Sequence, residues 1–178
     1  SVAAESYASA RSVSSLMPWW PAEAGVYRTS TQLTDGRLSI IVDPGAWTNL
    51  MGSTLSRKLA QAAVAAGHTP VQSKLDEALN IRGVGQGSQA CTWKMQCPIA
   101  LPQASGDSLL NSFTTPIVEG SGSELPGLLG LKTLEQHRAI LDVTTRQLHF
   151  PGPGDIEIVL PPGSVSHPLE KAPSGHLV

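Results

Sequence analysis

The sequence predicts an all-β domain that carries one or two short α-helices. It contains 17 Gly and 14 Pro, together about 17% of the chain against an average of about 12%, which indicates many turns between short strands. Residues 91–101 place Cys, Trp, Met, Cys, Ile and Leu at the odd positions and mostly polar residues between them, a pattern typical of a strand with one buried face. The run Ile40-Ile41-Val42 is β-branched, as in buried central strands.

The first predicted strands end at an aspartate, Asp43. Residues 1–24 have no periodicity and predict a linker, in which Trp19-Trp20 forms an apolar anchor that packs either on the domain or on a partner. A strand is expected over residues 26–33, a hairpin turn at residues 34–37 and a second strand over residues 38–42. This second strand stops at Asp43-Pro44-Gly45.

A single longer helix is expected over residues 52–67. Ser53 or Thr54 is the expected N-cap, the apolar stripe is Leu55, Leu59, Ala62, Ala63 and Ala66, and Gly67 closes the helix. Strands are expected at residues 79–82, 89–101 and 109–118, with a glycine cluster at residues 83–87 between the first two.

The last part of the chain is expected to form a short helix and a hairpin. The helix opens at Leu128-Leu129-Gly130 and runs to about Gln136, and the hairpin pairs residues 139–143 with 147–150. Proline and glycine accumulate from Pro151, so we expect irregular chain after Leu160. The predicted organisation is a linker at 1–24, one domain at 25–160 and a flexible tail at 161–178.

The charge composition excludes several classes of partner. The chain has 12 Lys and Arg, 14 Asp and Glu and a formal charge of −2, so it lacks the basic surface that nucleic acids require. No run approaches the roughly 18 uncharged apolar residues of a spanning helix. We therefore expect no nucleic-acid partner and no membrane.

Cysteine spacing and the N-terminal residues bear on the compartment. Cys91 and Cys97 lie in one predicted strand, where six residues span about 20 Å, too far for a disulfide. This favours a reducing compartment such as the cytoplasm. The chain starts at Ser1 without the apolar core of a secretory signal, and we expect it to be a piece cut from something longer.

The sequence lacks complete motifs for a metal site, a dinucleotide-binding loop or a serine nucleophile. The five histidines have no metal-ligand spacing, which predicts no metal site. The glycine cluster has Ser88 in place of the third glycine of a dinucleotide loop and precedes a strand. The loop Gly120-Ser121-Gly122-Ser123 lacks the strand-to-helix setting of a serine nucleophile. No cofactor is expected.

Asp43 remains the candidate for chemistry. The glycine two residues later allows a tight turn that aims backbone amides at the carboxylate, and such donors keep a buried acid ionised. A second acid beside it would share one proton, which provides a general base and a general acid. The alternative is a turn acid that is satisfied by loop amides.

Over residues 26–152 the sequence resembles the retropepsin-like aspartic proteases of retroviruses, retrotransposons and related cellular proteins. Three segments carry the resemblance: the loop Asp43-Pro44-Gly45-Ala46 looks like the family's catalytic loop, Gly83-Val84-Gly85-Gln86-Gly87 is similar to its flap, and Leu128-Leu129-Gly130 resembles the signature that braces the loop. The alternative interpretation of the glycine cluster is a plain hairpin turn instead of a flap.

The resemblance implies a closed-barrel-like acid protease fold and an aspartic endopeptidase that cleaves a polypeptide substrate as a homodimer, with one Asp43 from each chain. It also implies that the domain is part of a retrotransposon-like polyprotein. The sequence agrees, because no other Asp is followed two positions later by Gly. The family normally has Thr or Ser where this chain has Pro44, and that hydroxyl forms a hydrogen bond across the dimer axis, which proline cannot form. Trp47 stands where the family often has a polar residue. An inactive domain kept for dimerisation or peptide binding is therefore the alternative.

Overall fold

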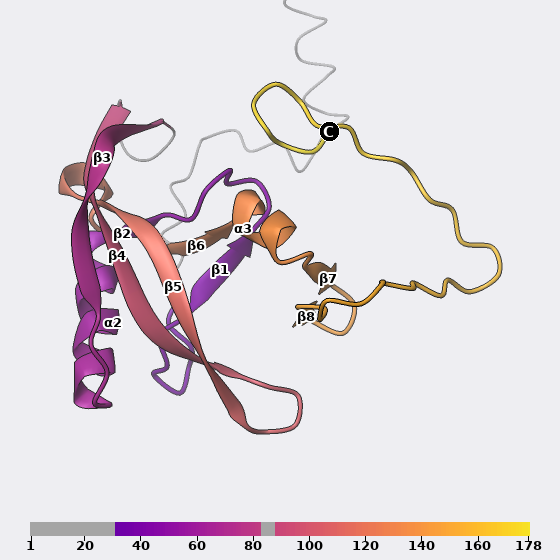
Figure 1. Cartoon of the computed structure of the whole chain (residues 1–178), viewed down its shortest axis with the longest axis horizontal. Coiled ribbons are helices and arrows are strands. Elements are labelled where there is room, and N and C mark those ends of the chain that lie inside the picture. The colour runs from indigo at the N-terminus through magenta and orange to yellow at the C-terminus, as the bar shows by residue number, and fades with distance from the viewer. Residues whose placement is uncertain (1–30, 83–87) are drawn as a thin grey trace, which may run out of the picture. The chain divides into compact units, whose positions relative to one another are not determined.

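The computed structural model describes residues 31–82 and 88–178 (Figure 1). The predicted linker, its Trp19-Trp20 pair and the glycine cluster at residues 83–87 lie outside this part. The helices and strands of the described residues are β1 (Ile40–Asp43), β2 (Met51–Gly52), α2 (Ser53–Ala65), β3 (Val71–Arg82), β4 (Ser88–Pro102), β5 (Ser108–Val118), the 3-10 helix η1 (Gly120–Gly122), β6 (Gly127–Gly130), α3 (Leu131–Gln136), β7 (Ile140–Asp142) and β8 (Gln147–His149).

The strands form one four-stranded sheet and two pairs. The sheet has the order β2-β5-β4-β3, β1 pairs with β6 in parallel, and β7 and β8 form an antiparallel hairpin. The predicted all-β class with two short helices is confirmed. The described strands do not close into a barrel, because β2 and β3 each pair on one side only within the four-stranded sheet.

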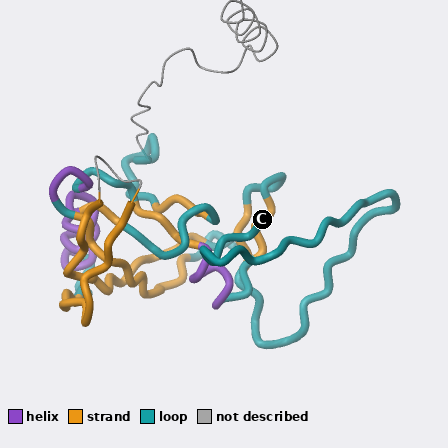
Figure 2. The backbone as a smooth tube through the Cα atoms, turned by 90° about the horizontal axis from the view of Figure 1, so that it is seen from above, coloured by secondary structure: helices purple, strands orange, loops and turns teal. Residues whose placement is uncertain are grey.

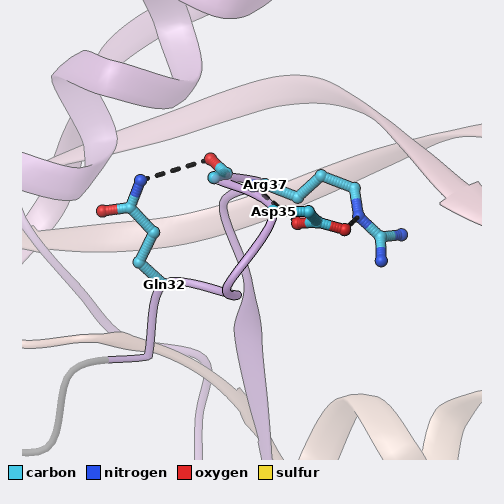
Figure 3. Close-up of polar contacts among 4 residues, drawn as sticks. Gln32, Asp35 and Arg37 are labelled. Carbon is cyan, nitrogen blue, oxygen red and sulfur yellow. Dashed lines mark hydrogen bonds and ion pairs between the residues drawn. The ribbon is translucent and has the colours of Figure 1, made fainter.

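The turn at residues 34–37 forms as predicted (Figure 3). Leu33 N donates to Arg37 O at 3.1 Å, and Gly36 has a φ of +85°, which favours glycine. Asp35 accepts from the Arg37 amide at 3.0 Å and from its Nε at 2.7 Å, and Gln32 donates to Gly36 O at 3.2 Å. Most of the strand expected before the turn lies outside the described residues.

Helix α2 starts at Ser53, and the cap differs from the prediction. Gly52 is the N-cap and no side chain caps the helix, so the prediction of Ser53 or Thr54 was wrong. The loop after η1 provides acceptors for the amides at the start of the helix instead: Thr54 N donates to Ser123 O at 3.1 Å and Gly52 N to Leu125 O at 3.0 Å. A Cβ at Gly52 would lie 2.2 Å from Ser123 O, so the close approach requires glycine.

The main core lies between the four-stranded sheet and α2. On β4, Cys91, Met95 and Cys97 are buried while Thr92 and Gln96 are exposed, which confirms the predicted alternation for residues 91–97. Leu101, which was expected on the buried face, is exposed. The core cluster consists of Met51, Ala63, Met95, Cys97, Phe113 and Ile117, with Leu55 and Leu59 of α2 packed against it. Within the predicted helical stripe, Ala62 and Ala66 are exposed.

Three strands were missed in whole or in part. The two-residue strand β2 was not expected at all. Only residues 79–82 of β3 were expected, because its first half is an exposed sheet edge without apolar alternation. The helix was expected to open at Leu128-Leu129-Gly130, but these residues belong to β6 (Gly127–Gly130), and helix α3 begins at Leu131. The four residues of β6 pair with β1 along its whole length, and this pairing decides their conformation.

Residues after β8 form no further strands or helices of regular length (Figure 2). Residues 170–178 nevertheless fold back on themselves as a short hairpin, with a bridge between Lys171 and Leu177. In the described part of the chain, no helix has the length and apolar character needed to cross a membrane.

Candidate functional site

Asp43 lies at the last position of β1, opposite Gly130 of β6 in the parallel pair. Its side chain is half-buried. Gly45 N donates to Asp43 Oδ1 at 2.9 Å, and Ala46 N donates to the Asp43 carbonyl at 3.1 Å. The chain therefore makes a tight turn that aims one amide at the carboxylate.

Glycine at position 45 allows this contact. A Cβ there would lie 3.1 Å from Asp43 Oδ1, the same oxygen that accepts from the Gly45 amide. Pro44 and Gly45 are exposed, whereas Ala46 is half-buried. Because Pro44 has no N–H and no hydroxyl, the loop presents no donor at this position.

The loop is held from the other side by β6 and α3. Leu131 N donates to Ala46 O at 2.8 Å, and Lys132 N donates to Trp47 O at 3.0 Å. A Cβ at Gly130 would lie 2.4 Å from the carbonyl carbon of Thr48 and 2.9 Å from Ala46 O. Only glycine permits the loop and the start of α3 to approach this closely.

Leu128 and Leu129 place β6 in the interior. Leu128 exchanges two backbone hydrogen bonds with Leu50, at 2.7 and 3.2 Å. Its side chain packs against the cluster that contains Leu50 and Val118, while Leu129 packs against the cluster around Met51. The two leucines thus secure the strand on which Gly130 approaches the loop.

Asn49 is a site residue that sequence reasoning missed. It is buried, and its Nδ2 donates to Thr114 O at 3.0 Å. Its Oδ1 accepts from Gly130 N at 2.9 Å and from Thr133 Oγ1 at 3.0 Å. One amide therefore links the end of the loop to β5, β6 and α3. The available signal was a polar residue directly before the apolar pair Leu50-Met51, because buried amides require partners.

Trp47 is the second unexpected feature. Its half-buried ring lies against residues 170–178: the Lys171 ammonium is 5.0 Å from the ring centroid, and the His176 ring packs edge-on at 6.5 Å. Lys171 and His176 follow Trp47 by 124 and 129 positions in the chain. They were not expected beside the loop, because no local sequence pattern predicts this contact.

Other parts of the described chain offer less chemistry. A cavity of about 440 Å³ is lined mostly by apolar side chains of β1, α2, β4 and their neighbours, and contains no predicted site residue. Among residues 31–82 and 88–178, no group of three or more His, Cys, Asp or Glu is placed to hold a metal ion. The predicted flap, Gly83 to Gly87, lies outside the described residues.

Comparisons with known proteins show a likeness in structure but not in sequence. No protein-family profile and no curated protein sequence matches the chain. Among solved structures, the chain is similar to the retroviral protease-like domain of Ddi1 from Leishmania major, with 18% sequence identity and a TM-score of 0.40. The match covers 64% of this chain and 78% of that chain.

Proposed function

We propose that the chain is a retropepsin-like aspartic endopeptidase domain that acts as a homodimer. The observation that carries the proposal is the setting of Asp43: a half-buried carboxylate at the end of β1, held by one amide on a loop that β6, α3 and Asn49 keep in place. Such rigid support is what a catalytic carboxylate needs.

Two chains are required because one chain offers one such acid. Asp35, Asp76, Asp107, Asp142 and Asp155 lack a glycine two positions later. Two Asp43 side chains at a molecular twofold axis would share one proton, since like charges at close range cannot both ionise easily.

The pair then performs acid–base catalysis on a water molecule. The ionised carboxylate accepts a proton as the water oxygen attacks the peptide carbonyl carbon, and the protonated carboxyl donates its proton to the carbonyl oxygen. The resulting tetrahedral diol loses a hydroxyl proton to a carboxylate as the C–N bond breaks, and the leaving nitrogen takes a proton from the other acid. Neither metal nor covalent intermediate is needed.

The test is peptide cleavage at mildly acidic pH with a mixed peptide library, read by mass spectrometry. We expect the full chain to cleave and Asp43→Asn to lose cleavage, because an amide cannot exchange the proton. Asp155→Asn is the matched control, since Asp155 is exposed in the chain after β8 and should cleave like the unaltered chain. Cleavage that survives in Asp43→Asn refutes the proposal.

Pro44 supports a second candidate, an inactive domain that dimerises or binds peptides. Pro44 is exposed and supplies neither the N–H nor the hydroxyl through which the loops of two chains could grip each other. A dimer in solution that cleaves no peptide, with or without Asp43→Asn, favours this candidate. We expect Pro44→Thr to strengthen dimerisation, measured by sedimentation equilibrium; an unchanged dissociation constant would mean that other contacts compensate.

A further inference from the structure

Residues 170–178, here called the 170–178 strap, form a closed hairpin without regular strands around them. Glu170 and Val178 exchange two backbone hydrogen bonds at 2.9 and 3.0 Å. Further in, Ala172 N donates to His176 O at 2.9 Å and Gly175 N donates to Ala172 O at 2.8 Å. The strap is thus folded locally, and its position depends on what it contacts.

The strap contacts Trp47. Gly175 has a φ of +88°, and a Cβ there would lie 2.8 Å from Cε3 and Cζ3 of the Trp47 ring, so its backbone packs directly on the indole. Lys171 and His176 contact the same ring, and Lys171 Nζ also forms an ion pair with Glu135 of α3 at 2.8 Å. The strap therefore joins the loop of Asp43 to the helix that braces it.

Trp47 directly follows the loop that carries Asp43. The hydrogen bond from Ala46 N to Asp43 O closes a turn, which keeps the Cα atoms of Asp43 and Ala46 within about 7 Å, and Trp47 is one Cα step of about 3.8 Å further. Its Cα is thus at most about 11 Å from that of Asp43. A second chain that brings its own Asp43 beside the first would approach this part of the chain, and the strap is packed on Trp47 there.

We infer that the 170–178 strap competes with a second copy of the chain for the Trp47 surface, so that it opposes assembly of the two-Asp43 site. The inference rests on the proposed function and adds its regulation. If the strap is docked in about 90% of the chains, only about a tenth of them can dimerise. The apparent dissociation constant of the dimer then rises about tenfold for each chain, or about a hundredfold when both chains must release their straps.

Two glycines provide a matched test of docking. Gly175→Ala and Gly163→Ala both place a side chain at a φ of +88°, but a Cβ at Gly163 meets nothing within 4 Å. The two variants therefore carry the same backbone cost and differ in the clash with Trp47. We expect the Trp47 indole N–H resonance, assigned with Trp47→Phe, to shift in Gly175→Ala and to stay in place in Gly163→Ala.

Dimerisation is then measured by sedimentation equilibrium on the same full-length chains. Gly175→Ala should dimerise at least tenfold more tightly than Gly163→Ala, and a synthetic peptide of residues 170–178 should reverse the gain. Equal dissociation constants, or a Trp47 resonance unmoved in Gly175→Ala, overturn the inference and leave the proposed function standing. Tighter dimers that cleave no peptide support the inference and refute the proposed function. No dimer in any chain overturns both.

Discussion

Gly130→Ala tests the close packing beneath the Asp43 loop. Gly130 has a φ of −82° and ψ of 164°, which alanine adopts freely, so the substitution adds steric overlap without backbone strain. The added Cβ would lie 2.4 Å from Thr48 C, 2.5 Å from Thr48 O and 2.9 Å from Ala46 O. All three are backbone atoms, which no rotamer change can move away.

The expected cost follows from comparison with two other glycines. Overpacking costs about 1–3 kcal/mol, and the backbone contacts at Gly130 place it at about 3 kcal/mol. At Gly127 the nearest atom is the methyl end of Met51 at 2.8 Å, which is flexible, so we expect about 1 kcal/mol. A Cβ at Gly152 meets nothing within 4 Å, and a change within about 0.5 kcal/mol is expected.

The assay is urea unfolding of the three alanine variants beside the unaltered chain, with free energies compared at equal slope. The predicted order of stability is Gly152→Ala, then Gly127→Ala, then Gly130→Ala. Peptide cleavage should fall most in Gly130→Ala, because the loop that holds Asp43 must move. A Gly130→Ala chain as stable as Gly152→Ala would refute the argument that this contact requires glycine.

Three further predictions concern single groups. Asn49→Ala should lower the free energy of unfolding by about 2–3 kcal/mol in urea, since it leaves the buried partners of the amide unpaired; no loss contradicts the bracing role. Burial raises the pKa of the Cys91 and Cys97 thiols, so a thiol reagent should react fully only after unfolding, and rapid native labelling contradicts this. Hydrogen bonds from the Thr145 hydroxyl and amide lower the pKa of Asp142. The ionised Asp142 therefore stabilises the fold above its unfolded-state pKa, and this stabilisation is lost as the pH falls through its folded-state pKa. Thr145→Val should raise the folded-state pKa of Asp142 in an NMR titration, and an unchanged pKa contradicts this.

The sequence was sufficient to predict elements whose pattern is local. The alternation on β4 reports burial of every second residue, and the turn at residues 34–37 depends on Asp35 and Gly36, which act within four residues. Likewise, the position of Asp43 at a strand end follows from the apolar run before it. In each case the signal and the structure lie in the same short segment.

The missed features depend on residues far apart in the chain. Gly52 replaces a side-chain cap because Ser123 and Leu125 supply carbonyls from another loop. Gly127–Gly130 is a strand because β1 lies beside it, whereas a helix was expected to open at Leu128. The amide of Asn49 and the cover over Trp47 likewise have partners that no local window contains.

The pairing of β1 with β6 also determines when the site can form. Asn49 contacts Gly130 and Thr133 across separations of 81 and 84 residues, and contacts of such long range close slowly. During synthesis, the segment around Asp43 emerges well before the residues that hold it in place. A nascent chain therefore carries Asp43 without the geometry around it, and under the proposed function peptide cleavage would arise only after the second half of the domain has left the ribosome.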